Sequence, residues 1–364
     1  MARSRPAWGS AIILPMSRTV AVRPLEEFVA RYLAARGFDA ESAGWMAHVI
    51  VTTEASGLVS HGLSQLFFMA PDIGKGVIPG QKPSVLRETA SSAVIDGGGV
   101  AAILAFRDAV DRGMAKASAQ GTAFISVLNA GWIGAPGPQL IRPAEAGFLC
   151  QVFVQHSGEP TVSPYGGMES RLSTNPMALA FPAPGGPVIA DFSTSAISNG
   201  RTWQMIREGR KAAVPLYLDK EGNPATDPEV FRHGGSVQPA GREDEGYKGF
   251  ALSLWHEALT AAAGGRTHQP GMEGTQNFHI TFVSPAVLSS REAYEREIGR
   301  FLAYVKSSRP RPGSPGIFLP GERSAAKRGE SERNGITVSD DKAGKLLALA
   351  AEIGRELELE PGKA

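Results

Sequence analysis

Short apolar runs alternate with helical patterns from about residue 90 onward, and this alternation constrains the fold more than any other feature. The runs SAVIDGGG, TAFISVL, FLCQVFVQ, MALAFPA and VIADFS have strand length and end in glycines or polar turns. An alanine-rich helical segment at 100–120 separates the first two runs, and further helical patterns follow at 250–263 and 290–305. Strands that alternate with helices predict an α/β layer structure.

Both ends of the chain have helical patterns instead. Amphipathic spacing predicts helices that begin at Pro24, Asp39 and Leu63, and a last helix over 340–357. A Pro/Gly-rich segment over 307–324 connects the α/β part to this last helix, which we expect to pack back on the first helices. We therefore expect three parts: a disordered extension over 1–21, a discontinuous helical domain of 22–85 with 310–364, and an α/β domain over 86–309.

The balance of charged residues argues against two classes of partner. The chain has 37 Lys and Arg against 36 Asp and Glu, which gives no electrostatic reason to expect nucleic acid or a membrane surface. No apolar stretch has the length of a membrane-spanning helix. The single cysteine, Cys150, cannot form a disulfide within one chain, which suits a reducing cytosol. We expect a cytoplasmic protein without nucleic-acid or membrane partners.

A glycine-rich loop follows the strand pattern TAFISVL, in the sequence VLNAGWIGAPGP. Gly131, Gly134 and Gly137 are three residues apart, so the loop lacks the G-x-G-x-x-G spacing of a Rossmann fingerprint. A loop between a strand and a helix N-terminus still suits an anion such as a phosphate. Glycines also make ordinary turns, and the bulky Trp132 is out of place in a phosphate loop. The loop alone therefore predicts either a cofactor contact or a plain turn.

His61 lies in a second motif, Ser60-His61-Gly62. Adjacent serine and histidine do not by themselves form a hydrolase pair, and no G-x-S-x-G elbow surrounds them. A lone histidine is more often structural than catalytic. The seven histidines of the chain are scattered, and HEALT at His256 lacks the second histidine of a zinc helix, so we expect no metal site.

The order of these motifs carries more information than any one of them. SHG, the glycine loop, GG…STNP, ADFSTS, YKGFAL and PGE follow one another within residues 22–356, and the set resembles the malate/L-lactate dehydrogenase family. That family includes ureidoglycolate, sulfolactate and 2,3-diketogulonate-type dehydrogenases and cyclic imino-acid reductases. The resemblance implies a homodimer and a non-Rossmann α/β fold, in which a mixed-sheet nucleotide-binding domain lies beside a mainly helical domain.

The resemblance also implies the chemistry. An enzyme of this family uses NAD or NADP to interconvert a small 2-hydroxy acid and its 2-oxo acid by hydride transfer. His61 would exchange the proton at the substrate oxygen, Ser60 would orient it and Asp191 would complete a relay. Histidine suits this role because its pKa lies near working pH. The implied cofactor contacts are Gly131, Trp132, Ile133, Gly134, Ala135, Asn175, Asp191, Phe192, Ser193 and Lys248.

Two positions that are expected to contact the substrate depart from the family's pattern. Trp132 stands where the family usually has a histidine, and an indole offers one N–H donor and no titratable proton. Gln65 stands where an arginine normally pairs with a substrate carboxylate, and glutamine cannot make that charged bidentate contact. Arg201 or Arg142 could supply the missing positive charge.

Three hypotheses about function therefore stay open. Retention of Ser60, His61, Asp191 and Lys248 favours an active 2-hydroxy-acid dehydrogenase. The replacements at 132 and 65 favour a protein that binds NAD(P) without efficient turnover. A cyclic imino-acid reductase is the third hypothesis, although SNGR at 198–201 resembles the hydroxy-acid branch more.

Overall fold

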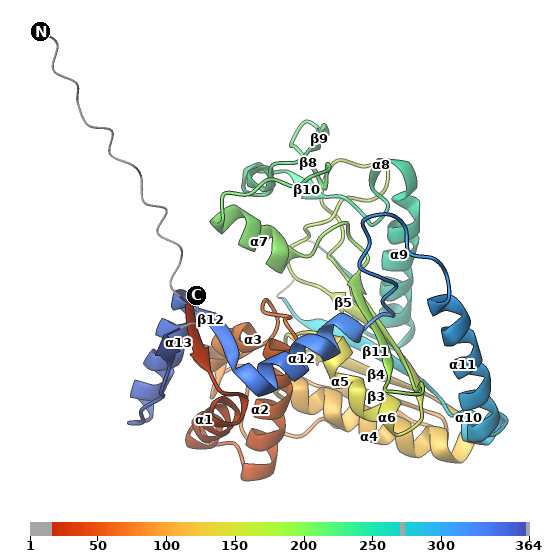
Figure 1. Cartoon of the computed structure of the whole chain (residues 1–364), viewed down its shortest axis with the longest axis horizontal. Helices are drawn as coiled ribbons and strands as arrows, with labels where there is room; N and C mark the ends of the chain where they lie inside the picture. The colour runs from red at the N-terminus through yellow and green to blue at the C-terminus, as the bar shows by residue number, and fades with distance from the viewer. Residues whose placement is uncertain (1–16, 270–273, 362–364) are drawn as a thin grey trace, which may run out of the picture.

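A seven-stranded sheet lies at the centre of the α/β part of this computed structural model, which describes residues 17–269 and 274–361 (Figure 1). The strand order is β2-β3-β4-β11-β5-β6-β7. β3 and β4 are parallel, and the other neighbouring pairs are antiparallel, so the sheet is mixed. The strands are β2 Ser84–Glu88, β3 Ser92–Asp96, β4 Thr122–Ala130, β5 Leu149–His156, β6 Pro176–Phe181, β7 Val188–Ser193 and β11 Gln276–Val283.

Two long helices cover opposite faces of this sheet, α4 (Ala102–Gln120) and α9 (Tyr247–Ala262). Side chains alternate between the faces of a strand, and β11 shows this directly. Phe278 and Phe282 point to α4, where Gly113 allows close approach because a Cβ there would lie 2.0 Å from the Phe282 ring. His279 points the other way and hydrogen-bonds Thr260 of α9 at 3.0 Å.

The remaining helices lie around these layers. Short 3₁₀ turns occur at Ala70–Asp72 and Pro228–His233. The α-helices are α1 Val22–Ala35, α2 Ala40–Ala55, α3 Leu63–Met69, α5 Pro136–Gln139, α6 Ile141–Glu145, α7 Asn199–Arg207, α8 Arg242–Glu245, α10 Pro285–Leu288, α11 Arg291–Lys306, α12 Glu322–Asn334 and α13 Asp340–Glu352. None of the described helices is both long and apolar enough to cross a bilayer.

Residues from both ends of the chain share one hydrophobic core. Leu25, Leu33 and Ile50 of α1 and α2 pack in the same cluster as Leu346 and Leu349 of α13. A small sheet beside this core pairs β1 (Ser17–Val20) with β12 (Ile336–Ser339) and with β13 (Glu360–Pro361). The expectation of disorder over 1–21 is therefore wrong for Ser17–Val20, which pair with a distant strand, while 1–16 lie outside the described residues.

A second small sheet was not expected from the sequence. β8 (Tyr217–Leu218) pairs with β9 (Pro224–Ala225) and with β10 (Ser236–Val237), over a separate core of Val162, Leu172, Tyr217 and Val237. It lies between β7 and α9 in the chain, inside the segment predicted as one α/β domain. Strands of two residues leave no period that a sequence pattern could reveal.

The predicted elements differ from the observed ones in three further places. The predicted domain boundary at residue 85 falls inside β2, which belongs to the central sheet. α12 was not predicted, because its sequence ERSAAKRGESERN has little apolar periodicity and buries Ser331 alone among its described residues. α13 ends at Glu352, short of the predicted residue 357.

Candidate active site

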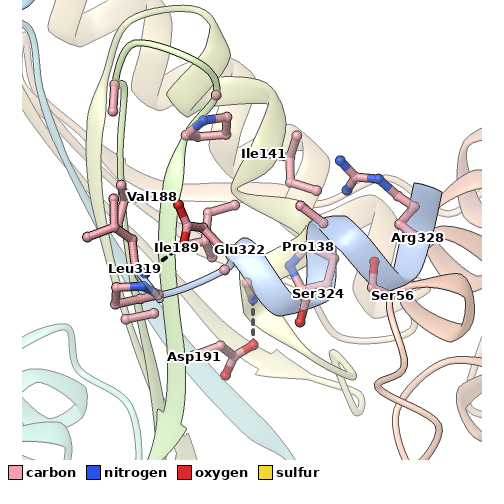
Figure 2. Close-up of a pocket in the computed structure, with 18 of the residues that line it drawn as sticks. Ser56, Pro138, Ile141, Val188, Ile189, Asp191, Leu319, Glu322, Ser324 and Arg328 are labelled. Atoms are coloured by element: carbon pink, nitrogen blue, oxygen red, sulfur yellow. Dashed lines mark hydrogen bonds between the residues drawn. The ribbon is translucent and has the colours of Figure 1, made fainter. Parts of the chain in front are cut away.

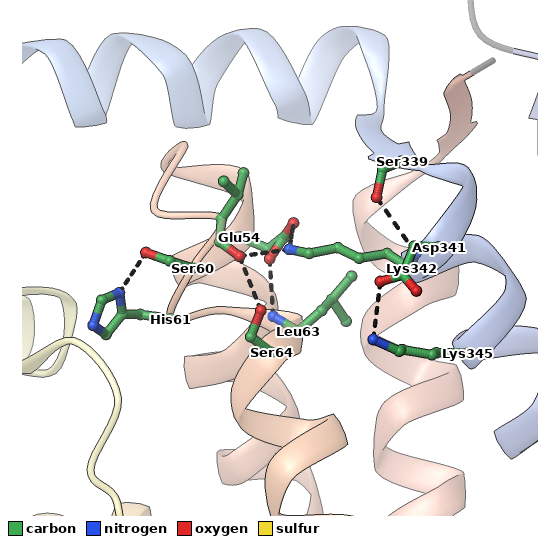
Figure 3. Close-up of polar contacts among 10 residues, drawn as sticks. Glu54, Ser60, His61, Leu63, Ser64, Ser339, Asp341, Lys342 and Lys345 are labelled. Atoms are coloured by element: carbon green, nitrogen blue, oxygen red, sulfur yellow. Dashed lines mark hydrogen bonds and ion pairs between the residues drawn. The ribbon is translucent and has the colours of Figure 1, made fainter. Parts of the chain in front are cut away.

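The loop between α2 and α3 carries the Ser60-His61 pair. Ser60 Oγ and His61 Nδ1 are joined by a hydrogen bond of 2.7 Å (Figure 3). Gly200, at the start of α7, packs against this pair, since a Cβ on it would lie 3.2 Å from Ser60 Cβ and 3.9 Å from His61 Cε1. The SHG and SNGR motifs, which are distant in sequence, are therefore neighbours in space.

His61 is half-buried, and burial lowers the pKa of its imidazole below the ordinary value. The described residues place no hydrogen-bond partner on its Nε2, while Nδ1 is held by Ser60. A ring oriented through one nitrogen, with the other nitrogen free, can pass a proton to or from a bound molecule.

The glycine loop lies against this histidine and is held by three glutamines. Gln65 Nε2 donates to Trp132 O at 2.9 Å, Gln276 Oε1 accepts from Ile133 N at 2.9 Å, and Gln139 Nε2 donates to Ile133 O at 2.9 Å. Gly134 has φ +72°, and a Cβ there would lie 2.4 Å from Gln65 Oε1. The glycine is therefore required both by the backbone conformation and by the approach of Gln65.

Trp132 and Phe68 form an aromatic wall beside His61. The Trp132 ring centroid lies 5.6 Å from that of His61 and 5.4 Å from that of Phe68, with an edge-to-face arrangement to the phenyl ring. Phe68 is 68% exposed, so one side of this wall faces open space. Beside the imidazole the chain thus offers apolar rings.

Asp191 lies on the exposed part of β7, next to the segment that follows the glycine loop. Its Oδ2 accepts a hydrogen bond from Gly137 N at 2.7 Å (Figure 2). Desolvation by the surrounding protein raises the pKa of this carboxyl to about 6, more than the Gly137 N–H lowers it. Among the described residues no hydrogen bond or ion pair joins Asp191 to His61, so the predicted relay between them is not formed directly in this structure.

A cavity of about 630 Å³ runs along β7 beyond Asp191 (Figure 2). Strand β7, the α5–α6 segment, and residues 319–328, which include the first turns of α12, form its walls. Ser56 and Leu58, from the loop that continues to Ser60 and His61, line it as well. The cavity therefore borders both the histidine loop and the segment that follows the glycine loop.

Arg328 is the notable charged side chain of this cavity. Most walls are apolar, with Ile141, Ile189 and Leu319 among them, whereas Arg328 makes no hydrogen bond or ion pair to any described residue. Glu322, by contrast, is paired with Lys306 and accepts from Leu319 N at 2.9 Å. An unpaired guanidinium beside apolar walls suits a ligand with both flat rings and phosphates.

Of the other residues predicted for the site, Phe192 lines the cavity, whereas Asn175 and Lys248 have their side chains engaged elsewhere. Phe192 and Ser193 follow Asp191 in β7, and Phe192 lines the cavity. Asn175 is fully buried, and its side chain bonds His156 N, Ser253 and Glu257. Lys248 is exposed and pairs with Glu245.

Arg142 and Arg201 were the candidates for the positive charge that Gln65 lacks. Both already interact with other side chains of the protein. Arg142 pairs with Asp111 at 2.7 Å and lies over the Trp45 ring. Arg201 of α7 donates to Gln204 at 2.8 Å, one residue beyond the Gly200 contact with Ser60. Of the two, Arg201 directly follows Gly200, the residue that packs against Ser60 and His61.

Sequence reasoning missed Glu54, Lys342, Gln276 and Arg328. Lys342 and Gln276 reach the site from distant parts of the chain, and Arg328 lines the cavity from α12, so no local pattern marks them. Glu54 is close to Ser60 in the chain, but its role depends on the distant Lys342. The PGE motif at 320–322 was the available signal for Arg328, because it begins the segment that closes the cavity.

Comparison with known proteins covers nearly the whole chain. Residues 20–347 match a family model described as malate/L-lactate dehydrogenase. The chain is 29% identical over 311 residues to an L-lactate dehydrogenase of Cupriavidus necator, which spans 82% of this chain and 88% of that protein. It is 28% identical over 345 residues to a malate dehydrogenase of Pyrococcus horikoshii, over 91% and 94% respectively.

Solved structures show the same fold. The malate dehydrogenase from Entamoeba histolytica superposes with a TM-score of 0.87 at 20% identity, over 94% of this chain and 99% of that chain. At 20% identity this similarity shows that the fold is shared and says nothing about the substrate.

Proposed function

The chain belongs to the malate/L-lactate dehydrogenase family and is a dehydrogenase acting on CH–OH groups, and from this premise we propose that it interconverts a small 2-hydroxy acid and its 2-oxo acid at His61. The resemblance and the α/β fold expected from the sequence are both confirmed. The observation that carries the proposal is the Ser60–His61 hydrogen bond of 2.7 Å, which leaves the second imidazole nitrogen without a partner among the described residues.

In this proposal His61 holds the proton that the substrate oxygen gains or loses. Ser60 fixes the ring through Nδ1, so that Nε2 serves the substrate. A pKa lowered by burial makes the protonated ring a stronger acid and keeps the neutral ring available as a base at neutral pH. In this proposal Asp191 lines the cofactor cavity and is not a direct hydrogen-bond partner of His61.

We propose the cavity along β7 as the NAD(P) site. Its volume of about 630 Å³ lies in the range of cofactor sites, its walls are largely apolar, and the unpaired Arg328 suits a phosphate. Asp191 and Phe192, both expected to contact the cofactor, line it. When bound, a nicotinamide supplies or accepts a hydride. The loop residues Gly131–Ala135 would then form the edge of the site next to His61.

We propose that the substrate carries a flat or apolar group. Trp132 and Phe68 supply an apolar wall beside His61, and Gln65 provides no positive charge. The Gln65 amide nitrogen is also engaged with Trp132 O, so its main contribution is to hold the loop. A compact dicarboxylate would leave a carboxylate without a cationic partner there, which costs several kcal/mol in a closed site.

We further propose a homodimer formed through α9. The side chains that α9 turns toward the sheet are small or polar, namely Gly249, Ser253, His256 and Thr260. Its apolar side chains face outward: Leu252 is 36% exposed, Leu254 48% and Trp255 54%. This inversion leaves an apolar helix face in water, which a second copy would cover.

Two other functions keep specific support. Trp132 in place of the family's histidine favours a protein that binds NAD(P) with poor turnover. The half-exposed Arg201 near the Gly200 contact would equally suit the carboxylate of a cyclic imino acid.

One experiment separates these functions. NADH and NADPH binding is measured by quenching of tryptophan fluorescence, and turnover is then measured with a panel of neutral, aromatic and dicarboxylic 2-oxo acids and a cyclic imine. Arg328→Ala is expected to weaken cofactor binding, with Arg323→Ala, on the same helix and stacked on Phe318, as the matched control. Absence of binding of either cofactor at millimolar concentration contradicts the proposed function, and binding without turnover favours the impaired enzyme.

A further inference from the structure

We infer that a buried ion pair between Glu54 and Lys342 fixes the loop that carries Ser60 and His61, which makes Lys342 a positioning residue for proton transfer (Figure 3). The inference rests on the proposed role of His61. Glu54 comes from the end of α2, and Lys342 comes from α13, 288 residues later in the chain.

The pair holds the loop on both sides of Ser60 and His61. Lys342 Nζ lies 2.5 Å from Glu54 Oε1 and donates to Val59 O at 2.6 Å. The other carboxylate oxygen, Glu54 Oε2, accepts from Leu63 N at 2.9 Å. Val59 directly precedes Ser60, and Leu63 lies two residues after His61, so both ends of the motif are attached to one charge pair.

The glycine of the motif permits this attachment. A Cβ on Gly62 would lie 2.5 Å from Glu54 Oε2 and 2.6 Å from Glu54 N. Any side chain there would push the loop away from the carboxylate. The requirement for glycine after His61 is therefore a requirement for contact with Glu54.

Lys342 occupies a helix position that disfavours a cation. It lies in the first turn of α13, whose N-cap is Ser339, and the positive end of a helix dipole is at that terminus. Asp340 and Asp341, which precede it, have the charge that suits this end. Helix stability does not explain Lys342, whereas pairing with Glu54 does.

Burial makes the pair sensitive to the loss of either partner. The Glu54 side chain is 1% exposed and that of Lys342 15%. Removal of one partner leaves an uncompensated charge, whereas replacement of both by neutral groups is often tolerated. A pair of this kind adds little net stability but defines one geometry, and the geometry it defines here is that of the His61 loop.

The test compares this pair with a second ion pair between the same two parts of the chain. Arg36 Nη1 and Glu352 Oε2, 3.0 Å apart, tie the end of α1 to the far end of α13, away from the His61 loop. The variants are Lys342→Met, Glu54→Gln and the double variant Glu54→Gln/Lys342→Met, with Glu352→Gln as the control. The double variant removes both charges of this pair and so guards against a failure to fold.

Two readouts are taken on each folded variant. We expect kcat to fall about 10- to 100-fold, as for a small misplacement of a catalytic group, with cofactor Kd within about twofold of the unmodified protein. The second readout needs no substrate. The pH titration of Trp132 fluorescence, taken as a difference from Trp132→Phe and lost in His61→Gln, reports the protonation of His61, whose ring is 5.6 Å from the indole.

In the Glu54 and Lys342 variants this titration is expected to move upward, toward that of a solvated imidazole, because the freed loop admits water. The control Glu352→Gln should leave both readouts unchanged. An unaltered titration and kcat in a folded Lys342 or double variant overturns the inference, and so does an equal change in Glu352→Gln. If the unmodified protein turns over no substrate, the proposed function fails but the titration still decides the positioning role.

Discussion

The imidazole of His61 and the indole of Trp132 lie with ring centroids 5.6 Å apart and planes inclined by 54°. The group proposed to move the proton and the group proposed to select the substrate therefore share one wall of the site. A change in either is expected to affect a different kinetic constant, which makes the two roles separable.

Loss of the imidazole should affect the chemical step. His61→Ala is expected to lower kcat roughly 10²–10⁴-fold with little change in cofactor Kd, as for the loss of a general acid. Steady-state kinetics and a fluorescence binding titration measure the two quantities. Unaltered turnover would return His61 to a structural role.

The pH dependence should follow the lowered pKa of His61. Reduction of the 2-oxo acid needs the protonated ring, so kcat/KM for reduction should decline as pH rises through a pKa below the ordinary histidine value. Oxidation of the hydroxy acid needs the neutral ring and should persist to a correspondingly lower pH. Rate profiles in both directions test this. A controlling pKa at or above that of free imidazole contradicts it.

Substrate choice should depend on Trp132. The unmodified protein is expected to act poorly on malate or oxaloacetate and better on an aromatic 2-oxo acid that stacks on the indole. Trp132→His should raise kcat/KM for oxaloacetate relative to the aromatic acid, and Gln65→Arg added to it should raise it further. Gln65→Met, which removes only the hydrogen bond to Trp132 O, is the control for loop support. Ordinary turnover of malate by the unmodified protein would refute this role of Trp132.

The outward face of α9 should hold two copies together. Trp255→Glu and Leu252→Glu are expected to convert a dimer to a monomer, because each puts a charge into a covered apolar contact. Sedimentation velocity measures the mass. Leu347→Glu, at an apolar position of α13 that is 48% exposed, is the control and should leave the mass unchanged. A monomeric unmodified protein rules out the dimer.

Asp191 should make stability depend on pH. Its folded pKa of about 6 lies above the unfolded value of 3.8, so the folded protein binds more protons between these pH values. The carboxyl therefore costs stability as pH rises through this window, and the cost remains above it. Asp191→Asn keeps an acceptor for Gly137 N and should raise Tm at neutral pH, with a gain that vanishes toward pH 4. Calorimetry across this range measures it, and a gain independent of pH would mean another cause.

Regular elements with a strong period could be predicted from the sequence, and contacts between distant segments could not. The strand patterns at β4, β5 and β11 and the helix that Asp39 caps all appear near their predicted residues, because local periodicity and capping determine them. The two-residue strands β8, β9 and β10 and the polar helix α12 carry no such period.

In the site, too, local relationships could be predicted from the sequence and contacts between distant segments could not. Ser60 beside His61 is a local relationship and was expected, but the attachment of Gln65 to the loop depends on Trp132, which is 67 residues away. Asn175 belongs to the STNP motif, yet its side chain is used inside the protein by Ser253 and Glu257 of α9. A motif identifies a neighbourhood, whereas the direction of a side chain depends on segments that the motif does not contain.

The Glu54–Lys342 contact also has a consequence for how the chain is made. A ribosome delivers Glu54, which precedes the SHG segment, 288 residues before Lys342 of α13. Until then the carboxylate of Glu54 has no cation, and β1 has no strand to pair with, since its partners β12 and β13 are also late. The nascent chain can thus complete its central sheet while the His61 loop is still unfixed. The proposed activity would reach its full rate only after α13 has left the exit tunnel.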